Sequence, residues 1–123
     1  MNKLELQKII KNDPNLTMHG FSDNLNPMNK HYGNINSQQS PMTINLLDKV
    51  NLCEDWLLKQ NYTKTLVTNG RPTTYQLKHY VEREKDTYIP AGCMIAAVLH
   101  LGIDYKRKPF TPDIWIPVSK KIV

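Results

Sequence analysis

The 123-residue sequence has few cysteines, no long apolar run and no recognisable secretion signal. Its two cysteines, Cys53 and Cys93, are too few for a disulfide framework or a four-cysteine zinc site. The longest apolar run, residues 91–99, is far shorter than the roughly 20 residues of a membrane-spanning helix. The first eight residues contain no apolar segment of the kind that directs secretion. We therefore expect a cytoplasmic protein with no membrane partner.

Short catalytic motifs are also absent. The chain has no glycine-rich phosphate loop, no Gly-x-Ser-x-Gly turn, no zinc-binding His-Glu-x-x-His and no Cys-x-x-Cys pair. Cys93 and His100 are seven residues apart, so on a helix they share a face but lie about 10 Å apart along the axis. That separation is too long for a nucleophile and its base. We interpret Cys93 as a buried side chain and His100 as a stabiliser of the last helical carbonyls. The sequence predicts no enzyme, no metal and no cofactor, and an enzyme of unrecognised type remains an alternative.

Positive charge is concentrated in the second half of the chain. The formal net charge is +5. Residues 1–58 carry five basic and six acidic side chains, whereas residues 59–123 carry eleven and five. Such an imbalance favours an anionic partner, of which nucleic acid is the commonest inside cells. The alternative is that the charge serves solubility alone.

The first half of the chain contains two predicted helices separated by an asparagine-rich stretch. Residues 2–11 have helical spacing of apolar side chains, and Pro14 prevents the helix from continuing. Residues 12–41 have no apolar periodicity, which predicts an extended arm or a functional loop. A helix over residues 42–59 follows, with Ser40-Pro41 as its cap and first turn.

Residues 73–102 are predicted to form a helical hairpin. Thr73 and Gln76 fit a capping box at the start of the first helix. Pro90 opens the second helix, which is apolar nearly all round and therefore buried, and Gly102 suits its left-handed end. The residues that the first helix is expected to bury are Leu77, Tyr80 and Val81.

Two short stretches, 63–68 and 114–118, have β-branched or alternating apolar residues that predict a minor β element. The fold class is therefore mainly α: a small domain of three to four helices with a helical hairpin core, a minor β element and a long N-terminal loop or arm. Residues 1–123 form a single domain, in which residues 42–123 are the helical core with a basic C-terminal segment.

Basic and aromatic side chains on and after the hairpin form a candidate binding surface. Lysine and arginine neutralise phosphates, and aromatic rings stack on exposed bases. The second helix is too apolar to read a major groove, so we expect contacts through the first helix and the C-terminal segment, with weak sequence specificity. For His79, the alternative is pairing within its own helix. The predicted binding residues are Lys78, His79, Arg83, Lys85, Tyr105, Lys106, Arg107, Lys108, Lys120 and Lys121.

Three segments resemble patterns found in small, largely uncharacterised bacterial proteins carried by phages and integrative elements. Residues 74–82 resemble Ser-Tyr-x-Leu-Lys-His-x-x-Glu, and residues 88–98 resemble Tyr-Ile-x-Asn-Gly-x-x-Ile-Ala-Ala-Ala. Residues 111–119 match a Ser-Pro-Asn start followed by alternating apolar residues more loosely. Ala91 stands where that pattern has asparagine. The resemblance implies an accessory protein of a mobile element and supplies no catalytic residues.

The leading hypothesis is a non-enzymatic protein that binds stoichiometrically to a nucleoprotein complex in the bacterial host. A specific form of it is an anti-defence inhibitor, similar in role to an anti-CRISPR protein. The alternative is direct, weakly sequence-specific binding or regulation of nucleic acid. Neutralising Lys106-Arg107-Lys108 is expected to abolish binding to naked nucleic acid in the second case and to spare a protein interface in the first.

Overall fold

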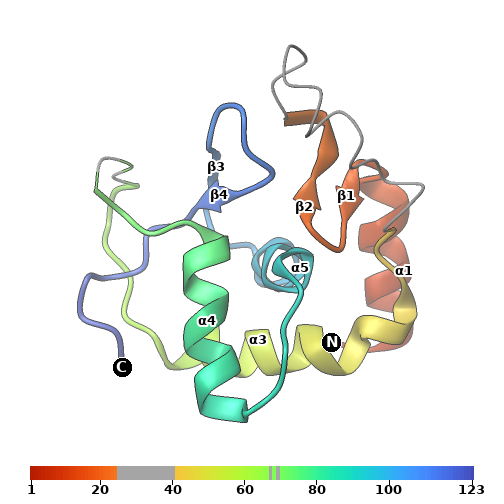
Figure 1. Cartoon of the computed structure of the whole chain (residues 1–123), viewed down its shortest axis with the longest axis horizontal. Coiled ribbons are helices and arrows are strands. Elements are labelled where there is room, and N and C mark those ends of the chain that lie inside the picture. The colour runs from red at the N-terminus through yellow and green to blue at the C-terminus, as the bar shows by residue number, and fades with distance from the viewer. Residues whose placement is uncertain (25–40, 67, 69) are drawn as a thin grey trace.

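The computed structural model of the chain describes residues 1–24, 41–66, 68 and 70–123, and it shows a mainly α protein (Figure 1). Helix α5 (Ala91–Leu101) is seen end-on at the centre. Helices α1 (Lys3–Asn12), α3 (Leu47–Lys59) and α4 (Thr74–Lys85) surround it on three sides and pack against it. The small mainly α domain predicted from the sequence is confirmed.

Most of helix α5 is buried because its side chains are apolar on nearly every face. All residues from Ala91 to Val98 are buried, as the pattern predicts. Gly102 ends the helix with φ 70°, a left-handed conformation that suits glycine. The other helix of the hairpin, α4, begins with the predicted capping box: Gln76 Oε1 accepts from the Thr73 backbone N–H at 2.8 Å.

The first helix also has a capping box, which the sequence analysis did not identify. Asn2 Oδ1 accepts from the Glu5 N–H, and Glu5 Oε1 accepts from the Asn2 N–H, both at 2.9 Å. The predicted bounds of this helix agree with the structure to within one residue.

Part of the predicted N-terminal arm is instead a folded hairpin. Strands β1 (Leu16–Thr17) and β2 (Gly20–Phe21) pair antiparallel, and a 3-10 turn, η1 (Ser22–Asn24), follows. Leu16 and Phe21 are both buried in the core. The prediction of an extended arm is therefore wrong for residues 12–24, because two apolar side chains of this segment pack in the core. Residues 25–40 of the predicted arm lie outside the described residues.

The β1–β2 hairpin sits against the first turn of α5, and a glycine makes this approach close. The Gly92 N–H donates to the Met18 carbonyl at 2.8 Å. A Cβ at position 92 would overlap the Thr17 carbonyl oxygen. Gly92 thus allows the hairpin backbone to pack directly on the helix.

Helix α3 begins later than predicted. A 3-10 turn, η2 (Ile44–Leu46), precedes α3, and Pro41 forms an isolated β-bridge with Thr17 rather than a first helical turn. Ser40, the predicted cap, lies outside the described residues.

The predicted β element near the C-terminus is only partly as expected. Strand β4 (Ile114–Trp115) pairs antiparallel with β3 (Lys106–Arg107). Residues 63–66 and 68 form no strand. Instead, Tyr62 bridges Val118, so the C-terminal segment runs beside the residues that follow α3.

None of the helices in the described ranges is long and apolar enough to cross a lipid bilayer.

Candidate nucleic-acid interface

A groove of about 820 Å³ lies where α4 faces two irregular segments. One wall is the start of α4, another is the loop around residues 68–72, and the third is the C-terminal segment. Figure 1 shows these segments on the side of the molecule opposite α1. The lining residues include three cations and two aromatic rings, and none of those described is acidic: Thr68, Gly70, Arg71, Pro72, Gln76, Tyr80, Lys108, Trp115, Ser119, Lys120 and Ile122. We call this the cationic groove.

Arg71 is held in place by the C-terminal segment. Its Nη1 donates to the Val118 carbonyl at 3.1 Å. A guanidinium has five N–H donors in a fixed plane, and this bond uses one of them. The bond holds the guanidinium at the groove wall.

The aromatic side chains of the groove are partly exposed and are packed against neighbours. Tyr80 stacks on Trp56 with ring centroids 6.0 Å apart, and the Arg83 guanidinium lies 4.8 Å from the Tyr80 ring centroid. Tyr80 is 37% exposed, so the prediction that α4 buries it is wrong. The Lys108 ammonium lies 5.9 Å from the Trp115 ring centroid. Each ring thus has a cation beside it.

The structure divides the predicted cluster Lys106-Arg107-Lys108. Lys106 and Arg107 are successive residues of β3, so their side chains point to opposite faces of the strand. Arg107 Nη1 donates to Asp23 Oδ1 at 2.8 Å, and its guanidinium lies 3.9 Å from the Phe21 ring centroid. Arg107 therefore joins the C-terminal hairpin to the N-terminal one, whereas Lys108 lines the groove.

Four more predicted residues lie elsewhere on the surface. Tyr105 stacks on Phe21 at 6.4 Å beside Arg107. Lys106 and Lys121 are exposed, and Lys85 is partly exposed at the end of α4. Only Lys108 and Lys120 of the predicted set line the groove.

His79 pairs within its own helix, which was the alternative interpretation. Its Nδ1 lies 2.7 Å from Glu82 Oε1, in a second hollow of about 710 Å³ that Arg83 also lines. The hydrogen bond to the Ile89 N–H and those to His79 and Lys78 outweigh partial burial and lower the pKa of Glu82. The carboxylate is therefore the favoured form.

Lys78 does not lie on the surface. Only 4% of the residue is exposed, and its ammonium lies 3.4 Å from Glu82 Oε2. The prediction that Lys78 belongs to an exposed basic surface is wrong, because α4 turns this side chain toward the segment that precedes α5.

His100 has a different role from the predicted contact with helical carbonyls. Its Nε2 lies 2.8 Å from Glu5 Oε2, and its Nδ1 makes a short hydrogen bond with Glu54 Oε1. Glu54 Oε2 also accepts from the N-terminal ammonium of Met1 at 3.3 Å. These contacts join α1, α3 and α5.

The cysteines are buried, as expected. Burial raises the pKa of both thiols, to about 12 for Cys93. In the described part of the chain, no group of three or more His, Cys, Asp or Glu residues is arranged to hold a metal ion.

Nine of the eleven lining residues, Arg71, Gln76 and Trp115 among them, were not among the predicted site residues. Arg71 follows Asn69-Gly70 in the sequence, and no local pattern connects this turn with residues 115–122. Only the pairing of the C-terminal segment with the region after α3 brings them together.

No protein-family model, no curated protein and no solved structure matches the chain. The function is therefore inferred from the groove itself.

Proposed function

We propose that this chain is a non-enzymatic protein that binds a single-stranded segment of nucleic acid in the cationic groove. The observation that carries the proposal is the composition of that groove: Arg71, Lys108 and Lys120 stand beside Tyr80 and Trp115, with no acidic residue in the described lining. Cations along a groove neutralise successive phosphates, and the aromatic faces stack on bases whatever their sequence.

A single strand suits the groove better than a duplex. The bases of a duplex are stacked on one another, so Tyr80 and Trp115 cannot reach their faces. The strongly apolar α5 offers no recognition helix for a major groove. The expected ligand is therefore single-stranded RNA or DNA, bound with little sequence preference.

The same groove suits a strand exposed on a nucleoprotein complex. In that form the chain is a stoichiometric accessory protein of a phage or mobile element, and inhibition of a CRISPR effector complex is the specific role we propose. This part of the proposal is supported by the resemblance of residues 74–82 and 88–98 to mobile-element proteins and by the basic second half of the chain.

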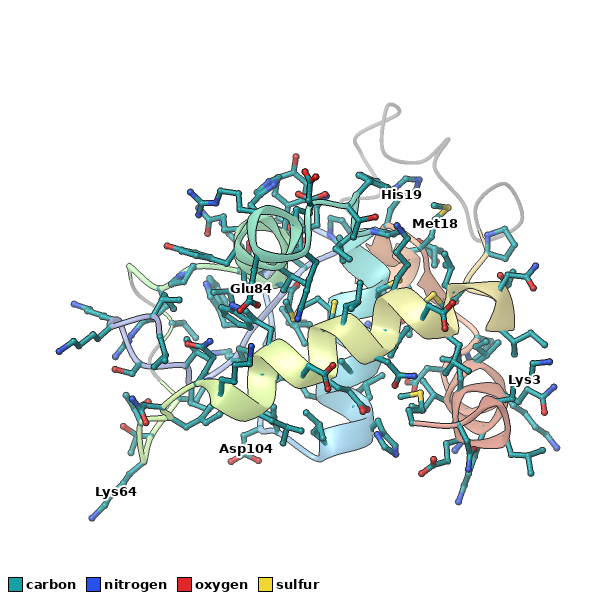
Figure 2. All side chains as sticks on the ribbon, turned by 90° about the horizontal axis from the view of Figure 1, so that it is seen from below. Lys3, Met18, His19, Lys64, Glu84 and Asp104 are labelled. Atoms are coloured by element: carbon teal, nitrogen blue, oxygen red, sulfur yellow. The ribbon has the colours of Figure 1, made fainter. Side chains whose placement is uncertain are left out.

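The groove is tested with a double variant, Lys108→Gln with Lys120→Gln, and a charge-matched control, Lys3→Gln with Lys8→Gln on α1. Figure 2 shows Lys3 on α1. Anisotropy of a labelled single-stranded oligonucleotide, measured over a range of salt concentrations, gives the affinity and its salt slope. Loss of two phosphate contacts is expected to weaken binding about tenfold at low salt and to reduce the slope by about 1.4. The control is expected to bind like the unmodified protein.

Equal affinities for the groove variant and the unmodified protein would contradict the proposal, and so would an absence of binding at low salt. Trp115→Leu provides an independent check on stacking, since each base–aromatic stack contributes about 1–3 kcal/mol. This variant is expected to weaken binding without changing the salt slope.

Direct binding of nucleic acid is distinguished from docking on a nucleoprotein complex by comparing two affinities. One is the affinity for the free strand, and the other is the affinity for a purified CRISPR effector complex that carries the same strand. Direct binding predicts similar affinities for both, and the groove variant lowers both. Docking predicts tighter binding to the complex and a smaller effect of the groove variant there.

A further inference from the structure

A separate hollow of about 320 Å³ lies on the other side of the start of α4. Tyr75 and Lys78 of α4 line it together with His19, Tyr88 and Asp113 from three other segments. Tyr75 and Gln76 are neighbours on the helix, yet Tyr75 faces this hollow and Gln76 faces the cationic groove. The two sites are therefore adjacent but distinct. The volume is at the lower end of the range for sites that bind small molecules.

The hollow contains a buried cation whose charge is poorly compensated. The Lys78 side chain is 6% exposed, and Glu82 Oε2, at 3.4 Å, is its one hydrogen-bond acceptor within the described residues. That oxygen already accepts from the Ile89 N–H at 2.9 Å, and the other carboxylate oxygen pairs with His79. An ammonium has three N–H donors, and a buried charge is costly unless its partners match it. Lys78 therefore has capacity for a further anionic partner.

Two tyrosine rings flank this ammonium. Its nitrogen lies 5.3 Å from the Tyr75 ring centroid and 4.6 Å from that of Tyr88. Both residues are more than half exposed. His79 holds the Tyr75 ring edge-on at 5.1 Å. A planar ligand can stack on either ring while its anionic group meets Lys78.

Asp113 adds a polar group that lacks a partner. Its Oδ1 is buried and has no hydrogen-bond partner among the described residues. Burial raises the pKa of this carboxyl. A carboxyl at the edge of a hollow with two aromatic rings suits the N–H groups of a nucleobase.

We propose that this hollow binds a nucleoside monophosphate, with the phosphate on Lys78, the base against Tyr88 and a base N–H on Asp113. A phosphate monoester carries close to two negative charges at neutral pH, which compensates a buried ammonium better than a single carboxylate does. The ligand is either a free mononucleotide or the terminal nucleotide of a phosphorylated strand. Binding of a free mononucleotide does not require the cationic groove.

The first test is calorimetric titration with the four ribonucleoside 5′-monophosphates, the corresponding nucleosides and inorganic phosphate. At least one monophosphate is expected to bind at least about tenfold more tightly than its nucleoside or inorganic phosphate. Lys78→Met and Tyr88→Ala are each expected to lose about tenfold or more, because one removes the cation and the other a stacking surface. Lys64→Met is the control, since Lys64 lies far from His19 in Figure 2.

Tyr88→Ala keeps the test valid if Lys78→Met fails to fold, because Tyr88 is 57% exposed. Failure of all four monophosphates to bind overturns the proposal. It is also overturned if a folded Lys78→Met protein, or Tyr88→Ala, binds the monophosphate as the unmodified protein does.

The second test compares 5′-phosphorylated and 5′-hydroxyl oligonucleotides in the anisotropy assay. Tighter binding of the phosphorylated strand, abolished by Lys78→Met or Tyr88→Ala, identifies the strand end as the ligand. Equal binding of both strands, together with monophosphate binding, identifies a free mononucleotide. If monophosphates bind but no oligonucleotide does, the hollow stands and the groove proposal fails. A different outcome is that oligonucleotides bind, monophosphates do not bind, and a terminal phosphate leaves the oligonucleotide affinity unchanged. In that case the groove proposal stands and the hollow proposal fails.

Discussion

Helices α4 and α5 follow each other in the chain and pack together, yet their surroundings are opposite. Eight consecutive residues of α5 are buried, including both small and large apolar side chains. Helix α4 buries a narrow line that contains Leu77 and Val81, and it exposes Tyr75, Tyr80, Arg83 and Glu84. Residues of α4 also line all three hollows described above.

The difference separates stability from recognition. Helix α5 stabilises the fold by burying apolar surface at the centre of the molecule. This hydrophobic contribution is non-directional. Helix α4 is anchored by one side and presents the other side to solvent between irregular segments. Substitutions in α5 should therefore affect folding, whereas those on the exposed side of α4 should affect binding.

The largest expected effect comes from Gly92→Ala at the start of α5. The added Cβ would overlap the Thr17 carbonyl oxygen, and backbone cannot give way as a flexible side chain can. We expect a loss of about 3 kcal/mol or more in the free energy of unfolding, measured by urea denaturation. Gly70→Ala is the matched control, because nothing lies within 4 Å of a Cβ there and only its φ of +72° opposes the change. Its cost should be about 1 kcal/mol. Equal costs at the two sites would show that the β1–β2 hairpin does not pack on α5 as described.

Two substitutions within α4 sharpen the comparison. Leu77→Ala is expected to cost about 2–4 kcal/mol, because Leu77 is completely buried and its removal leaves a cavity. His79→Ala should change stability by no more than about 0.5 kcal/mol, since its contact with Glu82 is near the surface. Thermal and urea denaturation of the two variants would measure this contrast. Similar losses in both would mean that α4 has no distinct buried and exposed sides.

A smaller effect is expected at the other end of α5, where His100 meets two carboxylates. The hydrogen bond to Glu5, with the contacts to Glu54, outweighs partial burial and raises the pKa of His100. In the unfolded chain histidine titrates near pH 6.5, so the folded state favours the protonated form. The stabilisation is complete below about pH 6.5 and is lost as the pH rises through the higher folded-state pKa.

The measurement is the melting temperature of the unmodified protein and of His100→Gln across this pH range. The unmodified protein should be the more stable below about pH 6.5, and the difference should narrow at alkaline pH. A difference that is constant with pH would exclude titration of His100 as its source.

Local patterns were sufficient to predict much of the helical part of the fold. The capping box at Thr73 and Gln76, the apolar run of α5 and the glycine at position 102 are signals that lie within a few residues of the structures they specify. The start of α3 was harder to predict from the sequence, because Pro41 pairs with Thr17, a residue far away in the chain. The β1–β2 hairpin was missed because its strands have only two residues each and no periodicity can be read from them.

The candidate site was predictable only in its chemistry. A basic second half with interspersed aromatic residues indicated an anionic ligand, and Lys108 and Lys120 do line the groove. Arg107 and Lys78 have the same charge, but one pairs with Asp23 and the other is buried beside Glu82. The charge of a side chain can be read from the sequence, whereas the group with which that side chain pairs depends on which segments of the chain come together in the fold.

The sequence by itself therefore determined the helices, the burial of α5 and the excess of positive charge, since these follow from side chains spaced a few residues apart. Only the tertiary structure decided that the loop around Arg71 meets the C-terminal segment, and that Lys78 turns inward between two tyrosines. The physical reason is that both arrangements depend on contacts between segments distant in sequence. Their geometry is set by packing around α5, and no local pattern encodes it.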